Sequence, residues 1–126
     1  MNKKYFILIL IFVFIGCSRS NSIIDFYNCP NKVLSDKTSH SLSYRVIAGK
    51  NDILKVEEVV YKNSYIISQV QFSEDAKIFI KSNSAKDFNY LFNSENNNDT
   101  FLIEIKTVDS EEAEASTQCI VEFNLP

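Results

Sequence analysis

The sequence comprises 126 residues with 13 basic and 16 acidic side chains, a formal net charge of −3, ten Phe, six Tyr and no Trp. A chain of this length has room for one domain with a single hydrophobic core. The acidic balance excludes most nucleic-acid ligands, because Lys and Arg contacts to phosphates supply most of the affinity in such complexes.

The chain begins with an apolar run that follows two positive charges. Lys3 and Lys4 precede eleven apolar residues, 5–15, and the run ends at Gly16 and Cys17. A helix that spans a bilayer needs about 20 apolar residues, so this run has roughly half the necessary length. A basic start, a short apolar middle and a small residue before a break are typical of a secretory signal peptide.

The sequence FIGC at Phe14–Cys17 resembles the lipobox of bacterial lipoproteins, in which signal peptidase II cuts before a cysteine that already carries diacylglycerol. The resemblance implies a signal peptide over 1–16, an acylated Cys17 as the first mature residue, and a lipid-anchored tether over 17–22. Lipoboxes usually have Leu and then Ala or Ser where this chain has Phe and Ile. An ordinary signal peptide and a short uncleaved anchor are the alternatives.

The lipobox also implies a location. A lipoprotein is held in the bacterial cell envelope by its acyl chains, and two or three chains are needed for stable attachment. In a cell that has an outer membrane, Ser18 after the cysteine resembles the signal for sorting to it, and the domain would then face the periplasm or the cell surface. The polar tether reaches about 15–20 Å when extended, so the domain stays close to the lipid.

Removal of the signal leaves 11 basic and 16 acidic residues, a net charge of −5, and two cysteines besides Cys17. Cys29 and Cys119 form an even pair in an oxidising compartment, which predicts a disulfide between them. Two free buried thiols are the alternative. A catalytic thiol would need a neighbouring base, and His40 is the single histidine in the sequence, so a Cys29–His40 pair is disfavoured.

Alternating apolar residues predict strands, because successive side chains of a strand point to opposite faces. Leu42, Tyr44, Val46 and Ala48 share one face, and in the last run Cys119 shares a face with Val121 and Phe123. Ile66, Val70 and Phe72 are expected on one face of a middle run. The alternation slips at Glu57–Glu58, which indicates a bulge or a strand end. The predicted runs are 42–48, 53–61, 64–72, 76–82, 100–108 and 118–125.

These runs predict a mainly β domain over 23–126, an antiparallel sandwich or a small barrel. Residues 84–92 are ambiguous: Phe88, Leu91 and Phe92 fit a short helix capped by Ser84, and a further strand is equally compatible. The polar stretches 93–99 and 109–116 are predicted to be exposed loops. No repeat and no second domain boundary are found.

Two surface sites are candidate contacts for a partner. Phe79 lies between Lys77 and Lys81 in a predicted strand, so it is expected either to project as a contact residue or to pack under a loop. Glu111 and Glu112 belong to an acidic turn that could receive a basic partner. That turn lacks the glycine and the ligand spacing of a calcium loop, and a solvated turn is the simpler interpretation.

The sequence predicts no catalytic or metal-binding site. With one His and a cysteine pair expected to be bridged, a zinc site lacks ligands, and Gly49, the single glycine after the signal, permits neither a phosphate loop nor a GxSxG motif. We therefore expect no cofactor, no metal and no enzymatic activity. The sequence favours a lipid-anchored, non-catalytic module that binds or inhibits another envelope or extracellular protein. The alternative is an accessory, pilotin-like lipoprotein in the assembly of a secretion, pilus or envelope complex.

Overall fold

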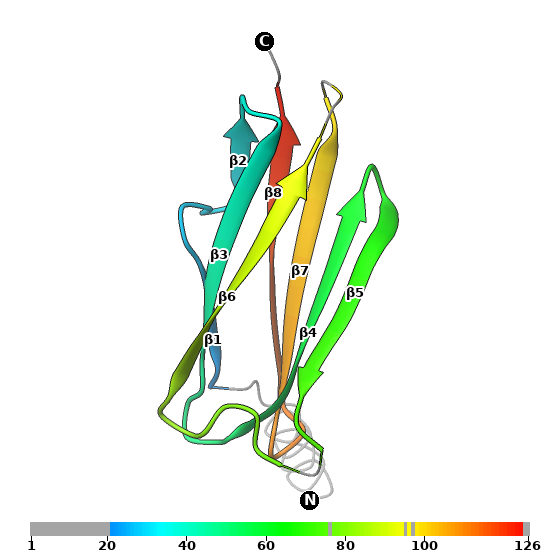
Figure 1. Cartoon of the computed structure of the whole chain (residues 1–126). Coiled ribbons are helices and arrows are strands. Elements are labelled where there is room, and N and C mark those ends of the chain that lie inside the picture. The colour runs from blue at the N-terminus through cyan, green and yellow to red at the C-terminus, as the bar shows by residue number, and fades with distance from the viewer. Residues whose placement is uncertain (1–20, 76, 95, 97, 125–126) are drawn as a thin grey trace, which may run out of the picture.

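The structure is a computed structural model that describes residues 21–75, 77–94, 96 and 98–124, so the predicted signal peptide and Cys17 lie outside the described residues (Figure 1). All of the regular secondary structure in the described ranges is β. The strands are β1 (Ile23–Phe26), β2 (Lys32–Ser35), β3 (Ser39–Ile47), β4 (Ile53–Lys62), β5 (Tyr65–Ser73), β6 (Ala85–Asn93), β7 (Thr100–Asp109) and β8 (Glu114–Phe123).

The strands form two sheets that pack face to face as a β-sandwich, which confirms the predicted fold class and decides between sandwich and barrel. The smaller sheet has the order β1-β3-β6 and the larger sheet the order β2-β8-β7-β4-β5. Neighbouring strands are antiparallel except for β2 and β8, which run parallel. Figure 1 shows β5 at the right-hand edge of the larger sheet.

The chain changes sheet between β1 and β2. Before this crossover Tyr27 donates a backbone hydrogen bond to Ser43 of the smaller sheet, and after it Ile120 of the larger sheet donates one to Asn31. The predicted disulfide is present at the crossover, where Cys29 is joined to Cys119 of β8. The bond therefore fixes the first of the described passages of the chain from one sheet to the other.

The core consists of the inward-facing residues of both sheets, and the predicted alternation holds in the central strands. On β3 the predicted set of Leu42, Tyr44 and Val46 is buried, and on β8 Cys119 is buried with its apolar neighbours. Phe101, Ile103 and Ile105 of β7 complete the same layer. Apolar burial of this kind, at about 25 cal/mol per Å², is the main force that holds the sheets together.

The helix considered for 84–92 is wrong: this segment is strand β6. It pairs with β3 in one unbroken antiparallel register from Ser39↔Asn93 to Ile47↔Ala85. Phe88 and Phe92 are four residues apart, a spacing that fits one helix face and one strand face equally well. Phe88 stacks on Tyr44 with ring centres 5.0 Å apart, so contacts between distant segments decide in favour of the strand.

The strand predicted over 76–82 is also wrong. Its described residues, 77–82, lie in an irregular connection between β5 and β6, where the backbone amides of Phe79 and Ile80 both donate to the Ile53 carbonyl. Ile80 is buried in the core whereas Ile78 is exposed. Apolar alternation here reflects a loop that sends one side chain into the core.

The irregularity expected at Glu57–Glu58 lies elsewhere. Both glutamates are in regular pairing, and the register between β4 and β5 shifts between Val60 and Tyr61. The shift pairs Ile66 with Tyr61 on the outer face, although the alternation predicts that Ile66 shares a face with Val70 and Phe72. A single extra residue in one strand is sufficient to reverse the face.

Candidate interaction surfaces

The sandwich has two ends of different character. At the tether end the described chain begins at Asn21, which packs so closely on Gly49 that an added Cβ would lie 2.5 Å from the Asn21 Cβ. Ser110 of the β7–β8 turn and Asn83 before β6 donate backbone hydrogen bonds to the β3–β4 connection at the same end, the lower end in Figure 1. The described part of the chain therefore starts at this end, which we call the tether end after the tether predicted over 17–22.

The far end carries the hairpin between β4 and β5. Asn63 and Ser64 form its two-residue turn, and both have positive φ angles, 47° and 75°. A type I′ turn requires positive φ at both positions, and it matches the twist of the flanking strands. The backbone of Asn63 donates to the Thr100 carbonyl, which ties the hairpin to the start of β7.

The sequence-predicted contacts lie on two different connections near the tether end. Lys77 and Lys81 are exposed and belong to the β5–β6 connection. Glu111 and Glu112 are exposed in the β7–β8 turn, whose backbone amides donate to the buried carboxylate of Asp109. The acidic turn is thus shaped by Asp109, a role that the sequence pattern does not indicate.

Phe79 does not project between its flanking lysines. It is half-buried and packs with Phe72 and Phe88, with ring centres 6.4 Å and 6.3 Å away, respectively. We call Phe72, Phe79 and Phe88 the aromatic cluster. Lys86 lies over the Phe79 ring, with the ammonium nitrogen 4.3 Å from its centre, a cation–π contact. Of the two arrangements predicted from the sequence, the structure therefore shows the one in which Phe79 packs against its neighbours and does not project.

The aromatic cluster fills the side of the sandwich where β5 and β6 are the last strands of their sheets. Phe72 of β5 and Phe88 of β6 have ring centres 5.0 Å apart, so the two edges are bridged by aromatic side chains. Burial raises the pKa of Tyr90 on β6, and a hydrogen bond with Ser68 of β5 opposes that rise. The opening between the sheets is therefore lined with aromatic rings along much of β5.

Strand β5 is the longest free edge of the larger sheet and carries no charged side chain over its nine residues, Tyr65–Ser73. Its first three residues are apolar and strongly exposed: Tyr65 is 78% exposed, Ile66 57% and Ile67 50%. Proteins usually protect a long edge strand with charge, proline or a covering loop, because its unpaired backbone groups can pair with another chain. Strand β5 carries neither charge nor proline, and the register shift near its start disturbs only its first residues.

Next to this edge, an apolar row crosses the outer face of the larger sheet. Leu102 of β7 pairs with Ile120 of β8 on one side and with Tyr61 of β4 on the other, and Tyr61 pairs with Ile66 of β5. Ile120, Leu102 and Tyr61 line a shallow groove that also includes the hairpin turn. The row therefore runs across four strands and ends at the exposed start of β5.

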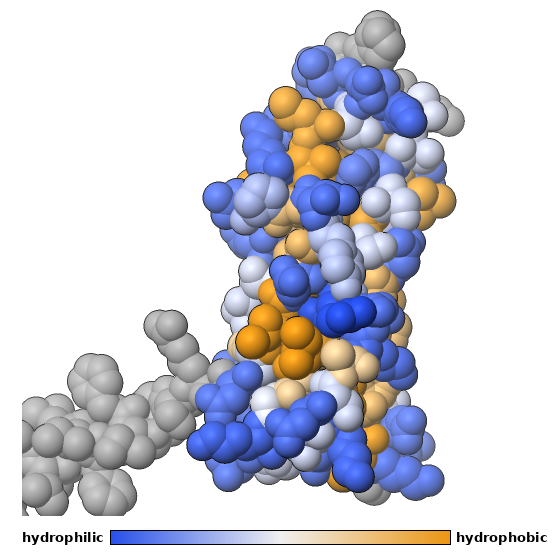
Figure 2. Space-filling model, turned by 90° about the vertical axis from the view of Figure 1, so that its left-hand side faces the viewer, coloured by the Kyte–Doolittle hydropathy of each residue, from blue (hydrophilic) through white to orange (hydrophobic). Residues whose placement is uncertain are grey.

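The opposite side of the molecule, which carries β1 and β2, is less continuous. Ile23 and Leu34 are exposed there. Figure 2 looks at this side and shows apolar atoms in separate groups with hydrophilic atoms between them. The ion pair of Lys32 with Glu122, 2.8 Å long, lies between β2 and β8 on the same side.

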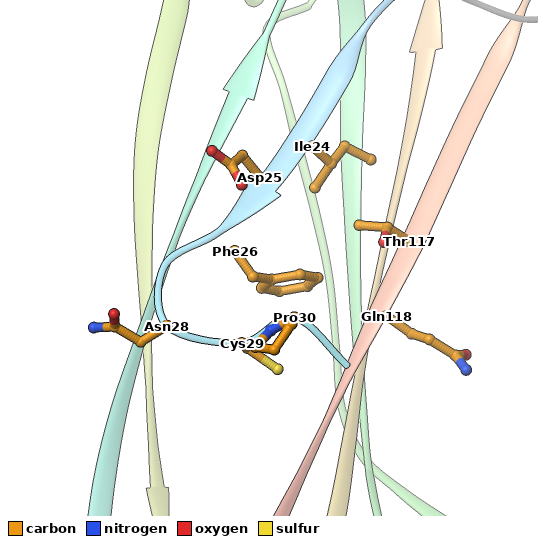
Figure 3. A pocket seen from close by; sticks show the side chains of 8 residues that line it. All are labelled: Ile24, Asp25, Phe26, Asn28, Cys29, Pro30, Thr117 and Gln118. Carbon is orange, nitrogen blue, oxygen red and sulfur yellow. The ribbon is translucent and has the colours of Figure 1, made fainter. Parts of the chain in front are cut away.

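A second groove lies at the crossover beside the disulfide. Figure 3 shows Ile24 and Phe26 of β1 facing Thr117 of β8, with Cys29 and Pro30 at one end of the groove. Strand β8 pairs with β2 only from Ile120 onward, so its earlier residues face β1 without forming a ladder. Phe26 contributes to the core by packing on Tyr44, so this groove is a seam between the sheets.

The buried polar groups support the fold. The Tyr44 hydroxyl donates to Glu58 Oε2 at 2.6 Å, and Ser94 donates to Asp99 at 2.6 Å. Burial raises the pKa of the Glu58 carboxyl above its ordinary value, and it also raises the pKa of Tyr44. The Ser94 hydrogen bond lowers the pKa of Asp99.

Neither a metal site nor a spanning helix is found among the described residues. No three His, Cys, Asp or Glu side chains in these ranges group closely enough to hold a metal ion. No helix in the same ranges is long and apolar enough to cross a bilayer.

No family model matches the chain, and no curated protein matches its sequence. Solved structures resemble its fold. Spo0M, a sporulation control protein from Bacillus subtilis, is 9% identical with a TM-score of 0.52 over 82% of this chain and 49% of that chain. The CARDB domain of a Pyrococcus furiosus protein, in complex with di-metal ions, is 12% identical with a TM-score of 0.51 over 86% of this chain and 96% of that chain. The chain thus spans about half the length of Spo0M, and at these identities the likeness concerns the sandwich fold alone.

Proposed function

We propose that this protein is a lipid-anchored, non-catalytic module of the bacterial cell envelope that binds another envelope or extracellular protein. The observation that carries the proposal is the gathering of exposed apolar side chains on the uncharged edge strand β5. An apolar, unprotected edge is costly in water, and a partner that covers it offsets this cost.

The position of this edge relative to the anchor supports the proposal. The lipobox resemblance places the acyl chains on Cys17, four residues before Asn21 at the tether end. The exposed start of β5 lies at the far end, and strand β4 between the two ends is ten residues long, about 30 Å at 3.3 Å per residue. An anchored domain would therefore present the start of β5 away from the lipid, where a partner can reach it.

The use of the buried polar groups also supports a binding role. Glu58, Asp99 and Asp109 each hold a strand or a turn through a hydrogen bond. A carboxylate that works as an acid or a base needs access to a substrate. Turnover of a substrate by the purified protein, lost on substitution of one carboxylate, would overturn the non-catalytic part of the proposal.

The location of the binding surface can be tested in cells with the full-length chain. A photo-crosslinking amino acid at Ile67 should give a discrete adduct with a second protein, which mass spectrometry identifies. The matched control is Leu91 on β6, an apolar residue that is 53% exposed. Adducts at Leu91 equal to those at Ile67, or none at Ile67, would contradict the proposal. Adducts made only of secretion or pilus components would assign the accessory, pilotin-like role.

A further inference from the structure

We infer that β5 binds its partner by strand addition: an extended, uncharged segment of the other protein pairs with β5 and extends the larger sheet. The inference rests on the proposed function and specifies the chemistry of the segment that is bound. Its alternate side chains are apolar and lie against the aromatic cluster.

The backbone of β5 supplies the first part of this site. In strand addition, main-chain hydrogen bonds give affinity, and pockets for alternate side chains give specificity. The register shift between Val60 and Tyr61 disturbs the start of β5, whereas Ser68–Ser73 pairs regularly with Val60–Lys55. A segment of about six residues therefore fits alongside 68–73, roughly 20 Å of edge.

The side chains of β5 determine which residues the segment carries. Val70 and Phe72 face inward, because they pair with the inward-facing Glu58 and Val56. A side chain on the same face of an added strand lies about 5 Å from its neighbour on β5, so it lies beside Val70 and Phe72 and close to the aromatic cluster. Such a position favours Val, Ile, Leu or Phe.

The same strand disfavours a charged segment. On the outer face, Gln69 and Gln71 offer amide groups, and no side chain of β5 carries a charge that could compensate an opposite charge. On the neighbouring strand β4, Glu57 is paired with Gln71 and already forms an ion pair with Lys55. Lys86 is engaged over Phe79. A segment with apolar residues alternating with uncharged polar ones satisfies both faces.

The tether favours a different protein over a second copy of this chain. Two copies paired antiparallel through β5 would have their tether ends at opposite ends of the joined sheet. Each sandwich is about 30 Å long, and a tether reaches only about 15–20 Å. Both copies could not then be anchored upright in one membrane, and this favours a segment from another protein.

A peptide of defined chemistry tests this mode of binding. The probe is a fluorescein-labelled, amidated decapeptide of alternating Val and Thr, titrated against the full-length protein in detergent and followed by fluorescence anisotropy. Two further peptides carry N-methyl groups on alternate amides, one on the odd-numbered and the other on the even-numbered residues. One of the two lacks the backbone donors that face β5, and that peptide should bind at least tenfold more weakly than the unmodified one. Equal binding of all three peptides, or no binding of the unmodified one, would overturn strand addition.

Two matched variants locate the site. Val70→Lys puts a charge on the inward face of the edge and should weaken peptide binding at least tenfold, whereas Leu91→Lys on β6 should leave it unchanged. Val70 is 39% exposed, and circular dichroism checks that the variant is folded. Equal binding by both variants would overturn the assignment to β5. Sedimentation of a dimer that Val70→Lys dissolves would make a second copy the occupant and overturn the choice of partner. If the peptide does not bind but Ile67 still forms a crosslink with a second protein, strand addition is overturned and the proposed function is not.

Discussion

Tyr44 and Glu58 join the two sheets through one buried hydrogen bond. The tyrosine lies on β3 of the smaller sheet and the glutamate on β4 of the larger one, and the hydroxyl oxygen is 2.6 Å from Oε2. Glu58 is only 4% exposed, so its carboxyl group is held in the core with the hydroxyl as its hydrogen-bond donor. A buried carboxyl of this kind makes the stability of the fold depend on pH.

We predict that the wild type loses stability as the pH rises and that the Glu58→Gln variant does not show this loss. Burial raises the pKa of Glu58 above its ordinary 4.5, so the folded chain binds this proton more tightly than the unfolded chain. The contribution of the Glu58 carboxyl group to the free energy of unfolding is fully present below pH 4.5, and it is lost as the pH rises through the raised pKa of the folded chain. Urea unfolding at a series of pH values should therefore show the Glu58→Gln variant gaining stability relative to the wild type above about pH 4.5.

Tyr44→Phe is the matched comparison. It leaves Glu58 buried without a donor, which should cost about 1.5–3 kcal/mol at pH 7, and less when the carboxyl is protonated. A Glu58→Gln difference that does not change between pH 4 and pH 8 would contradict the pKa shift. Asp99 responds in the opposite sense, because its pKa is lowered and its contribution is lost only in acid.

Loss of the disulfide should destabilise the domain strongly. Cys29 and Cys119 are 90 residues apart, and a bond over such a loop is worth about 4–5 kcal/mol in the chain-entropy model, often less in practice. Cys119→Ser should lower the free energy of unfolding by a few kcal/mol, and reduction of the wild type should have a similar effect. Two alkylatable thiols in protein purified from the envelope without reductant would show that the bond is absent in the cell.

Acylation is tested at Cys17. Because the apolar run before it is too short to span a bilayer, attachment should depend on the lipid alone. Labelled palmitate should enter the wild type but not Cys17→Ala, and the variant should be released from the membrane fraction. Equal labelling of Cys17→Ala and the wild type would refute the lipobox interpretation.

The hairpin turn offers a stabilising substitution. Ser64 has a φ of 75°, a region in which residues with a Cβ are strained and glycine is not. Ser64→Gly should therefore raise the free energy of unfolding by roughly 0.5–1 kcal/mol, and Ser64→Val should lower it. Thermal unfolding of the two variants in parallel gives the sign of each effect. Equal stabilities would mean that the turn relaxes on substitution.

The strands inside each sheet could be predicted because each has one solvent-facing side and one buried side. The alternation at Leu42–Ala48 and at Cys119–Phe123 therefore appeared directly in the sequence. The cysteine pairing followed from the count of cysteines once Cys17 was set aside. These are properties of a residue and its immediate neighbours.

The errors arose where distant contacts decide the structure. Phe88 and Phe92 fit a helix as well as a strand until β3 provides nine residues of pairing, and the two alternatives for Phe79 are decided only by its contacts with Phe72 and Phe88. The β5 edge could not be recognised from sequence, because an uncharged strand is equally suited to the middle of a sheet. Its position at the edge depends on the order of strands in the sheet, which the sequence pattern does not indicate.

The disulfide at the crossover has a mechanical consequence. If the lipid holds one end and a partner pulls on the far end, the load enters the domain through β1, whose four residues are the first that can peel from β3. Peeling reaches Cys29 after two further residues, and there the covalent bond transfers the load directly to β8, an interior strand of the larger sheet between β2 and β7. Extension under tension is thus limited to residues 23–28, so a domain that loses β1 would keep its remaining strands and its bound partner.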